Sequence, residues 1–173
     1  MSISLSGIRF WGPASPLGLS LALIAVLIDQ AQKWWTLHVY DLASKGTVSL
    51  SPFLDFVLVW NPGVSYGLLP QEGWIGQAVL IAIAIAAVAG FTVWLARTRS
   101  ALVAASIGLI IGGAIGNAID RALYGAVADF FSFHAFGFYW YVFNIADAAI
   151  VAGVAGLLYD SLFGSHKKVS KSS

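Results

Sequence analysis

"ALVAASIGLIIGGAIGNAIDR", residues 101–121, decides the fold class of this chain. No charged side chain occurs in it before Asp120. About 20 apolar residues suffice for an α-helix to cross the hydrocarbon core of a bilayer. The stretch therefore predicts a transmembrane helix over about 101–119, with Asp120 and Arg121 just beyond its end.

The composition of the whole chain agrees with a membrane protein. Of 173 residues, 59% are hydrophobic and 10% are charged, whereas soluble domains carry about 25% charged residues. Three further transmembrane helices are expected, over about 16–35, 74–96 and 141–163. We predict an all-α membrane fold, with residues 1–173 as one domain. The chain has no cysteine, which excludes disulfides and thiolate metal sites, and no basic stretch indicates a nucleic-acid partner.

Two longer loops connect the predicted helices, over residues 36–73 and 121–140. The first contains "TVSLSPFLDFVLVW", residues 47–60, whose β-branched and aromatic residues are typical of short strands. The second is dense in aromatic residues, which gather at membrane interfaces. We expect it to be a loop that lies at the membrane surface.

Lysine and arginine predict the orientation. An even number of spans puts both termini on one side, and the side richer in Lys and Arg is usually cytoplasmic. The terminal side has six of them (Arg9, Arg97, Arg99, Lys167, Lys168, Lys171) and the other side three (Lys33, Lys45, Arg121). Both termini are therefore predicted to be cytoplasmic, with the two loops and most aspartates at the outer face.

Small residues recur at every fourth position on two of the spans. Such spacing lets helix backbones approach closely in lipid. We interpret both runs as packing surfaces: Ala104, Gly108, Gly112 and Gly116 on one span, and Ala148, Ala152 and Gly156 on the other.

A serine-hydrolase motif occurs in the first loop. "NPGVSYGLLP", residues 61–70, contains the pattern G-x-S-x-G around Ser65, which is typical of a nucleophile elbow. Such a serine needs a histidine base and an acid. The histidines all lie outside the predicted spans: His38, His134 and His166. We therefore favour a glycine-rich turn over a nucleophile.

Polar residues gather at the outer ends of the spans. Ionisable groups within a membrane are costly and usually mark function. Residues three or four apart share one face of a helix, so we expect the polar pairs and Asp129 to converge at one depth: Asp29 with Lys33, Asn117 with Arg121, and Asn144 with Asp147.

Two aspartates in such a place can perform peptide hydrolysis. Like charges held close push the two pKa values apart, so that one carboxyl stays neutral while the other is ionised. The ionised one accepts a proton from water and the neutral one donates to the carbonyl oxygen. The H-E-x-x-H zinc motif is absent.

Spacing alone does not say which aspartates form the pair, and simpler interpretations stay open. Asp29 with Lys33 is consistent with a structural ion pair, and Asp120 with a local pair to Arg121. Asp147 near a helix N-terminus could merely stabilise the helix dipole.

The motifs taken together resemble those of the lipoprotein signal peptidase family, also called type II signal peptidase. The resemblance implies an aspartyl endopeptidase that needs no metal or other cofactor. It implies a location in the bacterial inner membrane with the active site near the periplasmic face. The implied substrate is a prolipoprotein that carries a diacylglyceryl group on a cysteine, and the cut falls just before that cysteine. The stretches are "DQAQK" (29–33), "NPGVSYGLL" (61–69), "GGAIGNAIDR" (112–121), "VADF" (127–130) and "FNIADAAI" (143–150).

The resemblance also implies roles for residues and a fold. The fold has four transmembrane helices with a small periplasmic β-cradle. Ser65-Tyr66 stands where the family often has Ala-Phe, which leaves the shape of the pocket open. The implied catalytic pair is Asp129 and Asp147, the substrate-binding residues are Asn61, Gly63, Asn117, Arg121 and Asn144, and the supporting residues are Asp29, Lys33 and Asp120.

Two other functions fit the sequence less well. A small proton-coupled transporter would use carboxylates to relay protons through the bilayer, but the predicted spans over 74–96 and 101–119 are uncharged. A purely structural membrane subunit would not need Asn, Asp and Arg side chains at one level.

Overall fold

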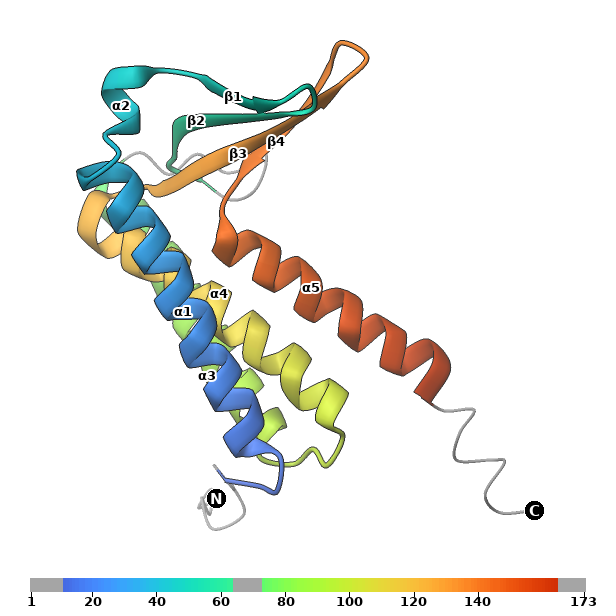
Figure 1. Ribbon diagram of the computed structural model, residues 1–173. Coiled ribbons are helices and arrows are strands. Elements are labelled where there is room, and N and C mark those ends of the chain that lie inside the picture. The colour runs from blue at the N-terminus through green and yellow to red at the C-terminus, as the bar shows by residue number, and fades with distance from the viewer. Residues whose placement is uncertain (1–10, 64–72, 165–173) are drawn as a thin grey trace.

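The computed structural model describes residues 11–63 and 73–164. Within these ranges, four long helices form a bundle with a four-stranded antiparallel sheet at one end (Figure 1). The predicted fold class is confirmed. The long helices are α1 (Ser15–His38), α3 (Trp74–Leu95), α4 (Ala101–Tyr124) and α5 (Ile145–Tyr159), and the short ones are α2 (Leu42–Lys45) and the π-helical extension of α5, η3 (Asp160–Gly164).

Four helices of the described chain are long and apolar enough to cross a membrane: α1, α3, α4, and α5 with its extension. Two boundaries differ most from the expected ones. The third helix continues to Tyr124, because the residue that ends it is Gly125, with a left-handed φ of 72°. The fourth begins at Ile145 rather than Tyr141, because residues 141–143 belong to a strand. Asp120 and Arg121 therefore lie within α4.

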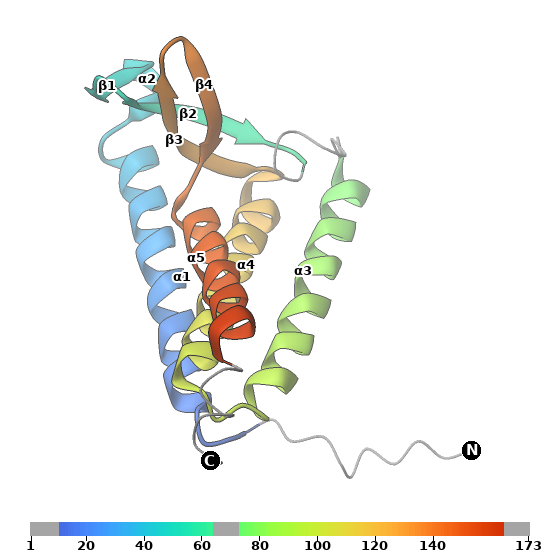
Figure 2. The same cartoon turned by 90° about the vertical axis from the view of Figure 1, so that its right-hand side faces the viewer.

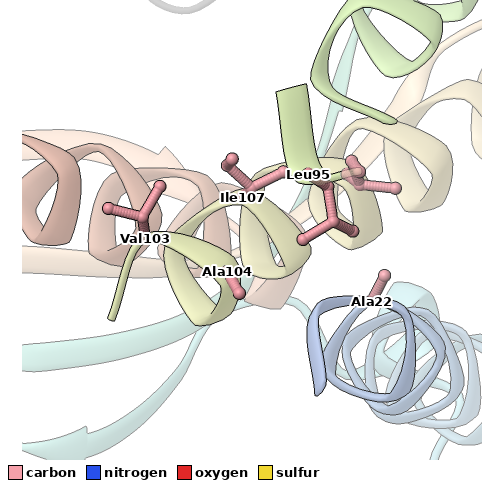
Figure 3. Close-up of a cluster of buried hydrophobic side chains, with 6 residues drawn as sticks. Ala22, Leu95, Val103, Ala104 and Ile107 are labelled. Carbon is pink, nitrogen blue, oxygen red and sulfur yellow. The ribbon is translucent and has the colours of Figure 1, made fainter. Parts of the chain in front are cut away.

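Helix α4 is the centre of the bundle. It packs against α1, α3 and α5, and Figure 2 shows α3 on the opposite side of α4 from α1. Three of these helices meet near the end of the bundle opposite the sheet, where Leu95 of α3 and Ile107 of α4 come together with Ala22 of α1 (Figure 3). α4 is thus the element that fixes where the other spans lie.

The small residues of α4 form a packing surface, as predicted, and the helix that they face is α1. A Cβ atom on Gly108 would lie 2.2 Å from the carbonyl oxygen of Gly18, and one on Gly112 would lie 2.6 Å from that of Ala22. Only glycine permits this approach of the two backbones. The prediction of a packing surface on this span is confirmed.

The second predicted packing surface was partly wrong. Helix α5 contacts α4 through Gly156 as expected, but also through Gly153, where a Cβ would lie 2.5 Å from the carbonyl oxygen of Ser106. Ala148 and Ala152 lie on another face of α5 and are exposed. The reason is the helical rotation of about 100° per residue, which turns positions 148 and 152 away from the contact.

The sheet has the order β1-β2-β3-β4. Strands β1 (Val48–Ser51) and β2 (Leu54–Asn61) confirm the strands predicted in the first loop. Strands β3 (Val127–Ala135) and β4 (Phe138–Phe143) correct the expectation of a surface loop over 121–140. They form a hairpin because aromatic residues favour strands and because Phe136 and Gly137 both adopt positive φ, 52° and 80°, as a two-residue hairpin turn requires.

Candidate active site

A buried ion triad lies where α1 and α4 approach the sheet. The Nζ atom of Lys33 is 2.9 Å from Oδ2 of Asp29 and 2.8 Å from Oδ2 of Asp120, and all three side chains are buried. The predicted Asp29–Lys33 pair is present. The local pair of Asp120 with Arg121 was wrong, because adjacent residues on a helix point about 100° apart and only Asp120 points toward Lys33.

The two carboxylates of this triad also hold the backbone beside the candidate catalytic residues. Oδ2 of Asp120 accepts a hydrogen bond from the backbone N–H of Ala128 at 3.1 Å. Oδ1 of Asp29 accepts one from the backbone N–H of Ala146 at 3.0 Å, one of the helix-start donors that lack a partner within their own helix. Asp129 and Asp147 are the next residues along the chain, so the triad sets the position of both.

The sequence analysis did not identify Gln30, whose side chain donates hydrogen bonds to both carboxylates of the same triad. Its Nε2 atom donates to Oδ1 of Asp120 at 3.0 Å, to Oδ2 of Asp29 at 3.1 Å and to the carbonyl oxygen of Gly116 at 3.2 Å. Gln30 lies inside the "DQAQK" stretch next to Asp29, and its neutral side chain gave no signal in the charge pattern.

Two asparagines join the carboxylates of Asp129 and Asp147. Nδ2 of Asn144 donates to Oδ1 of Asp129 at 2.7 Å and to Oδ1 of Asn117 at 3.2 Å. Nδ2 of Asn117 in turn donates to Oδ1 of Asp147 at 2.8 Å. The chain Asp129–Asn144–Asn117–Asp147 is therefore continuous, and it brings residues from β3, α4 and α5 into one cluster.

Asn144 and Asp147 also begin helix α5 as a capping box. Oδ1 of Asn144 accepts from the backbone N–H of Asp147 at 2.9 Å, and Oδ2 of Asp147 accepts from that of Asn144 at 3.2 Å. The expected interaction of Asp147 with the helix start is thus present. The cap uses Oδ2 of Asp147, and Oδ1 accepts from Asn117. Asp147 can therefore cap the helix and belong to the polar cluster at the same time.

The end of β2 completes the cluster. Nδ2 of Asn61 donates to Oδ2 of Asp129 at 3.2 Å and to Oη of Tyr141, a contact that the sequence did not suggest. Nη2 of Arg121 donates to the carbonyl oxygen of Gly63 at 2.8 Å. All the site residues named from the sequence therefore lie in one region, at the sheet end of the bundle. Ser65 and Tyr66 fall outside the described residues.

The two carboxyl groups have different surroundings. Asp129 is fully buried, and burial raises its pKa from 3.8 to about 7, with a further rise from the charge of Asp147. Hydrogen bonds from Asn144 and Asn61 oppose this rise. Asp147 is only partly buried and lines a large groove. Near neutral pH, Asp129 is therefore close to half protonated in the folded protein.

The hydrogen-bond donors around Asp129 are side-chain amides. Within residues 11–63 and 73–164, no group of three or more His, Asp or Glu side chains is placed to hold a metal ion. The oxygens of Asp129 accept from asparagine amides, which would have to be displaced by a cation.

Comparison with known proteins agrees with this geometry. Residues 21–163 match the family model described as signal peptidase (SPase) II. This chain belongs to the signal peptidase II family. It is therefore a protease of bacterial membranes, and nothing in the comparisons supports the transporter alternative.

Relatives and solved structures extend the match over most of the chain. The lipoprotein signal peptidase of Methylorubrum extorquens (strain PA1) is 56% identical, covering 84% of this chain and 85% of that protein. The one of Rhodopseudomonas palustris (strain TIE-1) is 50% identical, covering 86% and 93%. A solved bacterial membrane enzyme is 25% identical with a TM-score of 0.77, covering 88% of this chain and 92% of its own.

Proposed function

We propose that this signal peptidase II protein is an aspartyl endopeptidase that cleaves lipoprotein precursors, with Asp129 and Asp147 as the catalytic pair. The observation that supports it is the unequal environment of two linked carboxyls. Asp129 is buried with a pKa near 7, whereas Asp147 lies beside the groove. Pairs of carboxyls whose environments differ in this way are suited to act as acid and base.

In the proposed reaction, ionised Asp147 accepts a proton from water while neutral Asp129 donates its proton to the scissile carbonyl oxygen. The water oxygen bonds to the carbonyl carbon, which gives a neutral tetrahedral diol. When the C–N bond breaks, Asp147 passes its proton to the leaving nitrogen and a diol hydroxyl returns one to Asp129. Water is consumed, and both aspartates regain their starting states.

The substrate carbonyl must reach Asp129, which is buried and accepts a hydrogen bond from Asn61. The contact from Nδ2 of Asn61 to Oδ2 of Asp129 is the longer of its two amide contacts, 3.2 Å against 2.7 Å from Asn144. We propose that the carbonyl replaces Asn61 at Oδ2 while Asn144 keeps Asp129 in place. Hydrogen bonds at catalytic groups commonly rearrange when substrate binds.

We further propose that both termini are cytoplasmic and that the sheet end of the bundle is periplasmic. The support is the excess of Lys and Arg near the termini. The sheet end holds Asp29, Asp120, Asp129 and Asp147 together, so the catalytic pair lies near the periplasmic surface, where exported precursors arrive.

The test is single-turnover cleavage of a diacylglyceryl-modified precursor by purified protein. Asp129→Asn and Asp147→Asn should each reduce the rate by about 10²–10⁴-fold, since an amide neither accepts nor releases the proton. The double variant should be scarcely slower than either single one, because groups that act as a unit do not add. Asp41→Asn, at an exposed carboxylate, is the matched control.

A comparison of Asp129→Asn with Asp120→Asn tests which aspartate is the catalytic partner of Asp147. We expect that variant to lose thermal stability more than its rate of cleavage, because Asp120 pairs with Lys33 and Ala128. Normal cleavage by Asp129→Asn, together with an inactive but folded Asp120→Asn, would show that the wrong aspartate had been chosen.

A further inference from the structure

Tyr141 of β4 lies where the carboxylate cluster meets the groove. Its hydroxyl oxygen accepts a hydrogen bond from Nδ2 of Asn61, and its side chain lines the groove together with Asp147. Nδ2 of Asn61 also contacts Oδ2 of Asp129. One amide group therefore connects the phenol of Tyr141 to the carboxyl of Asp129, and the reaction proposed above gives this phenol no role.

A bulge in the β3–β4 pair helps to place Tyr141 there. Strand β4 contributes both Trp140 and Tyr141 opposite the single residue Phe133 of β3. Such bulges bend a strand and turn a side chain in a new direction, and they are common beside active sites. In Figure 1, β4 leads from the hairpin turn back to the start of α5. Tyr141 therefore lies on the segment that enters the cluster at Asn144.

The side chain of Asn61 is shared between Tyr141 and Asp129. Its Oδ1 atom accepts from the backbone N–H of Gly63 at 3.1 Å, which leaves the two hydrogens of Nδ2 to be donated. Hydrogen bonds to a carboxylate are usually about 2.7–2.9 Å long. The contact from Asn144 to Asp129 has this length, 2.7 Å, whereas the one from Asn61 is 3.2 Å. Asn61 is therefore not fully engaged with the carboxyl of Asp129.

The proton that Asp129 must carry as an acid explains why this sharing matters. Both oxygens of Asp129 accept from amide N–H groups, an arrangement that suits the ionised carboxylate. A protonated oxygen becomes a donor, so one amide has to withdraw from it. Asn61, with the longer contact, is the amide that withdraws more easily. A buried N–H group that loses its acceptor is costly, and the hydroxyl of Tyr141 supplies an acceptor for it.

We propose that Tyr141 is a positioning residue whose hydroxyl draws Asn61 away from Oδ2 of Asp129, which leaves that oxygen for the catalytic proton and the substrate carbonyl. The proposal rests on the proposed function, which makes Asp129 the acid. Tyr141 acts through Asn61 and not on the reacting bonds. The charged groups around the two side chains come from three helices and are unchanged when only the hydroxyl is removed: Lys33 of α1, Asp120 and Arg121 of α4, and Asp147 of α5.

The test is the pH dependence of cleavage of a diacylglyceryl-modified precursor by Tyr141→Phe, which lacks the hydroxyl and keeps the ring. Asn61 then turns fully to Asp129, and a donor to the carboxylate favours its ionised form. The pH at which kcat/KM falls to half of its maximum should therefore decrease by about half a unit to one unit, as expected for one hydrogen bond. The maximum itself should fall about two- to tenfold, because the carbonyl must displace a more firmly bound amide.

Two further variants show whether the effect belongs to this hydroxyl and passes through Asn61. Tyr139→Phe removes the hydroxyl of an exposed tyrosine of the same strand and should leave the pH midpoint unchanged. In an Asn61→Ala protein the hydroxyl has no amide to hold, so adding Tyr141→Phe should not move the midpoint again. A second movement as large as the first, or an unchanged or higher midpoint in Tyr141→Phe alone, would overturn the proposal.

Thermal unfolding in detergent micelles gives a second measurement that does not depend on cleavage. Burial raises the pKa of Asp129 to about 7, so the folded parent loses stability as the pH rises from about 5 to 8. With a lower pKa, Tyr141→Phe should lose less, and its fall in Tm over this range should be smaller by about 2–5 °C.

The outcomes separate this proposal from the proposed function. If the parent does not cleave the lipidated precursor, the proposed function fails. If the parent cleaves it, but Tyr141→Phe shows the same pH midpoint and the same fall in Tm as the parent, only the positioning role of Tyr141 is refuted.

Discussion

Replacing Asp129 by asparagine should make the folded protein more resistant to high pH. The carboxyl of Asp129 is fully buried and its pKa is raised from 3.8 to about 7. A raised pKa means that the unfolded chain releases this proton at lower pH than the folded protein does. The carboxyl therefore reduces stability progressively as the pH rises from about 4 to 7, and the loss is complete above pH 7.

The size of the effect follows from the two pKa values. Each pKa unit corresponds to 1.36 kcal/mol, so the full loss is about 4 kcal/mol, of which about 2–3 kcal/mol falls between pH 5 and pH 8. Asparagine has nearly the shape of the neutral acid, can keep an acceptor toward Nδ2 of Asn144, and does not ionise. The unfolding free energy of Asp129→Asn relative to the parent should therefore rise by that amount across this range.

Thermal unfolding in detergent micelles at several pH values measures this difference. For a chain of this length, 1 kcal/mol corresponds to about 2–4 °C in Tm, so Asp129→Asn should gain about 5–10 °C on the parent between pH 5 and pH 8. Asp41→Asn, at an exposed position, controls for the loss of a negative charge. Parallel Tm curves for parent and Asp129→Asn would refute the reasoning, because Asp129 would then ionise alike in both states.

Three further outcomes are expected. Lys33→Met should cost about 3–5 kcal/mol in detergent unfolding, because it leaves two buried carboxylates without their cation. Gly112→Ala should lower the free energy of unfolding by about 1–3 kcal/mol, and Tm with it, because its Cβ would lie 2.6 Å from a carbonyl oxygen of α1. Gly90→Ala is the control and should leave Tm unchanged, because a Cβ at this position would have no atom within 4 Å. Ser65→Ala and EDTA should leave cleavage intact; loss in either would contradict an aspartyl mechanism.

Much of the fold was predictable because membrane helices and strands have strong sequence signals. The long apolar runs predicted the four spans, and β-branched and aromatic residues before Asn61 predicted β1 and β2. The hairpin of β3 and β4 was missed because its turn is Phe136-Gly137, whereas the usual signal for such a turn is Asn-Gly or Asp-Gly. Gly137 between two aromatic runs was the available clue.

The site residues were predictable as a group, but their partners were not. Helical spacing brought Asp29 to Lys33, yet the second partner of Lys33 is Asp120, on another helix. Spacing along one helix says nothing about which face meets a neighbouring helix. For the same reason, Ala148 and Ala152 were wrongly predicted to lie in a packing surface. Such contacts depend on how the helices pack.

The start of α5 shows how fold and chemistry depend on the same residues. Asn144 caps the helix with its side-chain oxygen and holds Asp129 with its side-chain nitrogen. If the helix began one residue earlier or later, its side chains would turn by about 100°, and Asp147 would no longer face Asn117. Oδ1 of Asp29, which binds the N–H of Ala146, opposes such a shift. The buried triad thus preserves the geometry of a carboxyl pair that it does not touch.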